Sequence, residues 1–205
     1  MVLDRKSHWD NIYATKPLEK VGWYQPKPEL SLDLIDKTGL SRSASIIDIG
    51  GGDSLLVDHL IELGYTQVTV LDISENAIDR AKKRLGEKAH LVRWMVGDVL
   101  DLPGHMKFDI WHDRATFHFF TTPQEIELYT QLASNMVRTG GYLIMGTFSD
   151  QGPTTCSGMP ISQYSEGAMG RVLSKQFDKI HCYNIDHFTP DNCLQNYTFC
   201  YFKRI

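Results

Sequence analysis

The sequence predicts an α/β fold: a doubly wound, mostly parallel seven-stranded sheet with helices on both faces and an antiparallel C-terminal strand pair. Two observations predict this class. Between residues 46 and 177, short apolar runs alternate with helix-like segments, the order that gives parallel strands joined by crossover helices. Residues 177–205 then hold two strand-like runs separated by turn-forming residues, which predicts an antiparallel pair.

The bulk composition fits one globular domain. The 205 residues are 42% hydrophobic and carry a formal net charge of -4, so the chain can bury a single core. The slightly acidic balance argues against a nucleic-acid partner. No apolar run approaches the roughly 18 residues of a membrane span, and no apolar signal segment opens the chain. We therefore expect no membrane partner and a cytoplasmic location.

The cysteines and histidines do not have metal-site spacing. The four cysteines are Cys156, Cys182, Cys193 and Cys200. None forms a C-x-x-C pair, and the chain is long enough to fold without disulfides, so we expect reduced thiols. The eight histidines are scattered and form no H-E-x-x-H motif. We therefore expect no metal.

The amino-terminal 45 residues combine a helix signal with aromatic residues. Pro28 and Gly39 stand where a helix would begin and end. The aromatic residues before this helix are Trp9, Tyr13, Trp23 and Tyr24. They either cover a ligand site or anchor this part of the chain in the core, because aromatic faces attract cations and also pack well.

The next elements alternate as a parallel sheet requires. Residues 46–49 predict a buried strand, three glycines follow, and residues 55–63 predict a helix that ends at Gly64. Residues 67–74 are rich in β-branched residues and predict a second strand. Ser74 is placed to cap a helix that ends at Gly86. Strands at 90–98 and 107–113 complete this half.

The second half begins with a strong helix signal. Thr122, Pro123 and Glu125 form a capping box with proline at the first helical position. After Gly140 and Gly141 the sequence predicts a fifth strand at 142–148. A helix interrupted by two glycines follows at 162–177, and the final pair of strands is predicted at 177–188 and 196–205.

A carboxylate stands at the end of each of the first four predicted strands. They are Asp48, Asp72, Asp98 and Asp113. In an open parallel sheet, ligands bind beyond the carboxyl ends of the strands. The glycines after Asp48 allow a ligand close to the backbone, and an acid 20 residues beyond them is placed to bind a ribose.

The glycine pattern distinguishes two nucleotide-binding interpretations. A dinucleotide fingerprint requires G-x-G-x-x-G, but the position of the third glycine is Leu55. NAD binding is therefore disfavoured. The sequence instead resembles the class I S-adenosylmethionine-dependent methyltransferases, whose first motif is acid-x-Gly-x-Gly-x-Gly. Asp48, Gly50 and Gly52 match this motif, while Ser54 replaces its last glycine.

The resemblance extends from about residue 7 to the end. The segments "HWDNIY", "WHDRATFHFF" and "CSGMP" are similar to those of a small, mostly uncharacterised subgroup of this family. The resemblance implies one methyltransferase domain over 1–205. It consists of an N-terminal helical and aromatic arm (1–45), a cofactor-binding core (46–148) and a C-terminal part (149–205).

By the pattern of the family, S-adenosylmethionine is the cofactor. The glycine loop would hold its methionine part, Asp72 its ribose, and Ile73, Asp98 and Val99 its adenine, with Asp113 near the methyl group. Trp23 is a candidate to cover the sulfonium. The implied cofactor-binding residues are Asp48, Gly50, Gly51, Gly52, Asp72, Ile73, Asp98, Val99, Asp113 and Trp23.

The implied reaction is an in-line displacement onto an acceptor, with Asp113 and His118 as catalytic candidates that orient or deprotonate it. A histidine beside aromatic residues is, however, more often a hydrogen-bonded packing residue than a base, and His118 can have that role. The short segment after the fifth strand and the aromatic arm favour an enclosed pocket and a small-molecule acceptor, a thiol or an amine. The alternatives are a protein lysine methyltransferase, an NAD-dependent oxidoreductase and a non-catalytic cofactor-binding module.

Overall fold

The computed structural model describes residues 4–205, which contain a seven-stranded sheet of order β3-β2-β1-β4-β5-β9-β8. Its strands are β1 (Ser45–Ile49), β2 (Gln67–Asp72), β3 (Val92–Val96), β4 (Phe108–Arg114), β5 (Val137–Phe148), β8 (Phe177–Phe188) and β9 (Leu194–Arg204). β9 pairs antiparallel with β5 and β8, and the other pairs are parallel. The predicted fold class is confirmed.

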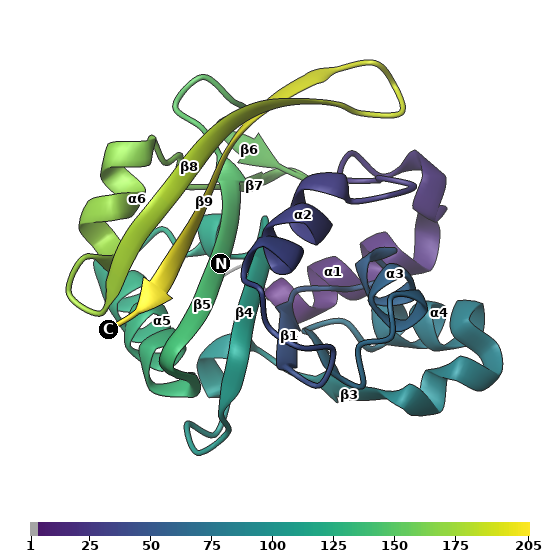
Figure 1. Cartoon of the computed structure of the whole chain (residues 1–205). Coiled ribbons are helices and arrows are strands. Elements are labelled where there is room, and N and C mark those ends of the chain that lie inside the picture. Colours follow the sequence, from purple (N-terminus) through teal and green to yellow (C-terminus); the bar gives the residue numbers. More distant parts are fainter. Residues whose placement is uncertain (1–3) are drawn as a thin grey trace.

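Helices cover both faces of the sheet (Figure 1). They are α1 (Arg5–Thr15), α2 (Glu29–Lys37), α3 (Leu56–Glu62), α4 (Glu75–Leu85), α5 (Pro123–Met136) and α6 (Glu166–Leu173). Short 3₁₀ turns are η1 (Leu18–Lys20), η2 (Gly86–Leu91), η3 (Val99–Asp101) and η4 (Phe117–Phe119). Ile47 and its face of the sheet pack against α5 and α6. Ile46, which points the other way, packs with α2, α3 and α4.

The register of the parallel strands brings their carboxyl ends to one edge. Ile49 of β1 lies beside Leu71 of β2 and Asp113 of β4, and Asp72 lies beside Val96 of β3. The residues that follow these four strands are therefore neighbours in space although up to about seventy residues separate them in sequence. This edge is where an open parallel sheet binds ligands.

The structure also contains elements that the sequence analysis did not place. The arm includes α1, whose first turn is capped by Asp4; residues 1–3 of the arm lie outside the described residues. β5 begins at Val137 and runs through Gly140 and Gly141 instead of starting after them. A small hairpin of β6 (Thr155–Cys156) and β7 (Met159–Pro160) follows β5. The predicted capping box at Thr122 is confirmed.

The expectation of four reduced thiols was wrong, because Cys182 and Cys200 form a disulfide. The two residues lie directly opposite each other on the antiparallel strands β8 and β9. Their pairing depends on the register of this hairpin, which cysteine spacing does not reveal. Cys156 and Cys193 are free. Over residues 4–205, no helix has the length and apolar character needed to cross a membrane.

We expect Gly146→Ala to destabilise the protein. Gly146 of β5 pairs with Phe199 of β9, and a Cβ at position 146 would collide with the buried Phe199 ring. Overpacking of this kind costs about 1–3 kcal/mol. Urea denaturation should show this loss of unfolding free energy, whereas Gly104→Ala, whose Cβ would meet nothing within 4 Å, should change little. Equal stability of the two variants would contradict this packing.

Candidate functional site

A cavity of about 770 Å³, its open mouth included, lies at the carboxyl edge of the sheet. The arm covers one side and the ends of β1, β2, β3 and β4 form the other. The lining residues of the arm are Arg5, Trp9, Tyr13 and Trp23. Those of the sheet edge and following turns are Ile49, Gly50, Leu71, Asp72, Ile73, Gly97, Asp98, Val99, Arg114, Ala115, Thr116, Phe119, Phe120 and Cys156.

The structure brings part of the predicted site together in this cavity. The predicted residues that line it are Gly50, Asp72, Ile73, Asp98, Val99 and Trp23. The predicted residues outside its lining are Asp48, Gly51, Gly52, Asp113 and His118. The second group is buried below the lining or in the glycine loop.

The glycine loop after β1 has no room for side chains. Gly50 and Gly52 have φ values of +61° and +52°, in the left-handed region that glycine tolerates best. A Cβ at Gly50 would overlap the hydroxyl of Thr116, and one at Gly52 would lie 2.5 Å from the hydroxyl of Tyr13. Glycine at these two positions therefore allows Thr116 and Tyr13 to pack directly against the backbone of the loop.

Asp48 supports the loop from below. Its side chain is buried and lies 2.6 Å from Nδ1 of His112, whose Nε2 lies 2.8 Å from the hydroxyl of Ser31. A Cβ at Gly51 would come within 2.5 Å of the Asp48 carboxylate. These hydrogen bonds thus join β1, β4 and α2 next to the glycine loop.

Asp72 presents a buried carboxyl group at the end of β2. The backbone N–H of Ser74 donates to its Oδ1 at 2.8 Å, and its Oδ2 would lie 3.1 Å from a Cβ at Gly52. Burial raises the pKa of Asp72 to about 7, because removing a carboxylate from water disfavours its charge. Hydroxyl groups of a ligand that donate to this carboxyl group would compensate for that lost hydration.

At the end of β3, the Asp98 side chain accepts a hydrogen bond from the backbone N–H of Leu100 at 2.9 Å. This bond starts the turn η3 and places Val99, which is buried, against the cavity. Ile73 lines the same side from the end of β2. A polar edge at Asp98 and two aliphatic side chains suit a planar heterocycle with a hydrogen-bonding rim.

Asp113 and His118, the two catalytic candidates, do not line this cavity. Both are fully buried. Asp113 accepts from the backbone N–H groups of Thr116 and Phe117 at 2.9 and 3.2 Å and from the hydroxyl of Tyr129. Burial raises its pKa to about 6. Burial lowers the pKa of His118 to about 3, which favours its neutral form.

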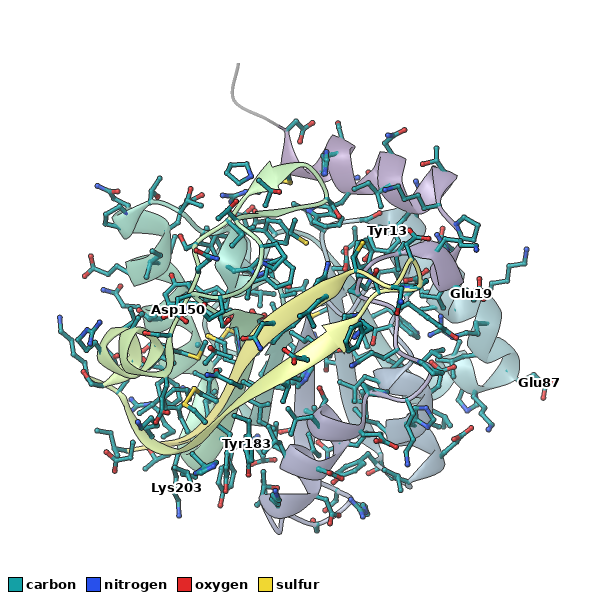
Figure 2. All side chains as sticks on the ribbon, turned by 90° about the horizontal axis from the view of Figure 1, so that it is seen from above. Tyr13, Glu19, Glu87, Asp150, Tyr183 and Lys203 are labelled. Carbon is teal, nitrogen blue, oxygen red and sulfur yellow. A yellow bond between two sulfur atoms is a disulfide. The ribbon has the colours of Figure 1, made fainter. Side chains whose placement is uncertain are left out.

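The arm is fastened over the site by polar contacts with α4. Arg80 donates to the backbone oxygens of Tyr13 and Lys16 at 2.8 and 2.7 Å, and Ser74 donates to Asp10 at 2.6 Å. Figure 2 shows Tyr13 on the inner side of α1, directed toward the rest of the molecule. The rings of Trp9 and Trp23 are 5.7 Å apart. The result is an aromatic wall opposite the sheet edge.

Five cavity residues were not assigned a binding or catalytic role from the sequence: Arg5, Arg114, Phe119, Phe120 and Cys156. The "WHDRATFHFF" and "CSGMP" segments contain four of these five residues, but they indicated only a subgroup. Arg114 makes no ion pair with any residue in 4–205. The described residues also contain no cluster of metal-binding side chains.

The raised pKa of Asp72 has a measurable consequence for stability. Between pH 4 and pH 7 the unfolded chain releases this proton while the folded one keeps it. Ionisation of this residue therefore disfavours folding as the pH rises. We expect Asp72→Asn, which resembles the protonated form, to gain stability relative to the parent across this window, by up to about 1.4 kcal/mol per pH unit. Urea unfolding of the ligand-free proteins measures this difference; a pH-independent difference would contradict it.

Comparison with known proteins agrees with this geometry. Residues 46–141 match the family model of the methyltransferase domain. Malonyl-[acyl-carrier protein] O-methyltransferase of Anoxybacillus flavithermus is 28% identical over 109 residues, 52% of this chain and 40% of that protein. This chain therefore spans less than half of that relative. EEF1A lysine methyltransferase 2 of Danio rerio is 25% identical over 158 residues, 70% of this chain and 68% of that protein.

A solved structure shares the fold over nearly the whole chain. The 1,6-didemethyltoxoflavin-N1-methyltransferase of Burkholderia thailandensis, determined with its substrate and S-adenosylhomocysteine, superposes with a TM-score of 0.74 at 19% identity. The superposition covers 97% of this chain and 86% of that one. Residues 46–141 thus match the methyltransferase-domain family, and the chain has the fold of the class I S-adenosylmethionine-dependent methyltransferases.

Proposed function

We propose that this protein transfers the methyl group of S-adenosylmethionine to a small molecule that carries a thiol or an amine. One observation supports this most strongly. A single cavity combines the strand ends that suit a nucleoside with an aromatic wall from the arm. Enclosed, largely apolar pockets with a few polar groups suit small ligands.

The residues present fit the cofactor. In the proposed placement, adenine lies among Ile73, Asp98 and Val99, and Asp72 accepts hydrogen bonds from the ribose hydroxyls. The methionine part runs along the backbone of Gly50, a residue that lines the cavity. Asp48, Gly51 and Gly52 act by shaping this loop. The core at 46–148 would thus bind the cofactor while the arm at 1–45 covers it.

The bound cofactor supplies a methyl group on a positively charged sulfur. The protein's task is positioning, because holding an acceptor about 3–3.5 Å from the methyl carbon accounts for much of the rate enhancement of such a step. Trp23, Trp9 and Tyr13 exclude water, and their ring faces attract positive charge. Asp113 is a positioning residue, because it holds the turn that carries Thr116 against the loop.

Other functions are less well supported. A lysine side chain of a protein acceptor would need the arm to open, although a relative with that acceptor, the zebrafish enzyme, is similar over 70% of this chain. An NAD-dependent oxidoreductase lacks support because of Leu55 and because of the family match. A non-catalytic module would bind the cofactor without turnover, so the acceptor experiment below distinguishes it. The cytoplasmic location stays a prediction.

Calorimetry tests the cofactor assignment. We expect S-adenosylhomocysteine to bind and NAD not to bind. Asp72→Ala should weaken S-adenosylhomocysteine binding by about 1.5–3 kcal/mol, the range for hydrogen bonds to a charged group. Asp79→Ala removes an exposed carboxylate from α4 and should bind like the parent. Clear binding of NAD alone, or parental affinity in Asp72→Ala, would overturn the assignment.

The acceptor class is tested with cofactor that carries a labelled methyl group. The protein is incubated with a cell extract, and the products are separated by a size filter. We expect label in the filtrate, and we expect Asp72→Ala to reduce it strongly. Label confined to a protein band would instead favour the lysine methyltransferase alternative. Cofactor binding without labelled product in any extract would favour the non-catalytic module.

A further inference from the structure

Arg114 is a cavity residue for which the proposed cofactor placement has no use. It follows Asp113 at the end of β4 and lines the cavity. Its Nη1 donates to the backbone oxygen of Trp23 at 2.8 Å. Its Nη2 is buried, and no atom of residues 4–205 forms a hydrogen bond with it. A charged guanidinium that is withdrawn from water with one of its nitrogens unpartnered is costly, so the group calls for an anion.

The residues around Arg114 do not supply that anion. The guanidinium lies over the ring of Tyr197, 5.5 Å from its centroid, and burial raises the pKa of this phenol and keeps it neutral. Burial also raises the pKa of the neighbouring Cys156 thiol to about 11. The carboxylate of Asp48 is bonded to His112 and is not within ion-pair distance of Arg114. Arg5, by contrast, is paired with Glu125 at 2.6 Å.

The order of the strands indicates which ligand the guanidinium faces. Along the sheet edge, Asp98 follows β3, Asp72 ends β2, Gly50 follows β1 and Arg114 ends β4. The proposed cofactor occupies the first three of these positions. Arg114 lies beyond them, over Tyr197 of β9 and near Cys156 of the hairpin that follows β5. This is the end of the cavity left for the acceptor.

We propose that the methyl acceptor carries a carboxylate, and that Arg114 binds it at the β4 end of the cavity. This inference rests on the proposed function. Arginine suits the role because its planar group can donate two parallel hydrogen bonds to a carboxylate. The Arg114 side chain is already oriented, because its Nη1 donates to the backbone oxygen of Trp23 and its guanidinium lies over the ring of Tyr197. An anionic acceptor would also be drawn toward the positive sulfur of the cofactor.

The test compares the affinities of a carboxylate and of its uncharged amide for the protein saturated with S-adenosylhomocysteine. Benzoate and benzamide serve as the probes, because they have similar shape and suit an aromatic cavity. We expect benzoate to bind the parent at least roughly tenfold more tightly than benzamide, from the charge-assisted hydrogen bonds. Arg114→Met should reduce this preference to below about twofold, and Arg114→Lys should keep part of it. Arg5→Met, which removes an already paired arginine from the same cavity, should retain the preference.

The affinity for S-adenosylhomocysteine shows whether Arg114 binds the carboxylate of the acceptor or that of the methionine part of the cofactor. We expect Arg114→Met to bind it within about threefold of the parent. If this variant instead loses cofactor affinity and benzoate shows no preference, Arg114 serves the methionine carboxylate and the inference fails. Equal binding of benzoate and benzamide by the parent, or a preference that survives in Arg114→Met, also overturns it. Failure of the parent to bind S-adenosylhomocysteine would contradict the proposed function, and benzoate titration of the ligand-free protein then tests Arg114 separately.

Discussion

The glycine loop after β1 is crowded on three sides, and the arrangement of the cavity depends on that crowding. Asp48 lies beneath it, the hydroxyl of Thr116 beside it and the hydroxyl of Tyr13 above it. Each neighbour comes from a different element: β1, the turn after β4 and α1. Because glycine has no Cβ, these three elements can converge on one stretch of backbone. The convergence closes the sheet edge into a cavity.

Buried polar groups hold the converging elements in place. The bonds from Asp48 to His112 and Ser31 connect β1, β4 and α2. Asp113 ties the turn after β4 to Tyr129 of α5. Such networks rigidify a core when every member is satisfied. The cavity wall differs, because Asp72 and Arg114 keep hydrogen-bonding capacity that their protein neighbours do not use. We take these two groups as the ones available to ligands.

Local sequence patterns predicted the parts of this arrangement that depend on local chemistry. The sequence predicted the alternation of strands and helices, the capping box at Thr122 and the acids at the strand ends. The surroundings of Asp113 could not be predicted in this way, because this acid is covered by Tyr129, which lies on a helix 16 positions away. The disulfide between Cys182 and Cys200 depends on hairpin register in the same way. α1 was not placed because only Ile12 and Tyr13 of its residues are buried, so it shows little apolar periodicity.

The central claim is that the strand ends at Asp72 and Asp98, with the glycine loop, hold a nucleoside beneath the aromatic arm. A crystal structure of the protein with S-adenosylhomocysteine tests it most directly. The account predicts ribose hydroxyls within hydrogen-bond distance of Asp72, adenine beside Asp98 and Val99, and Arg114 free of contact with the methionine carboxylate. A nucleoside bound outside this cavity, or bound within it without contact to Asp72, would contradict the account.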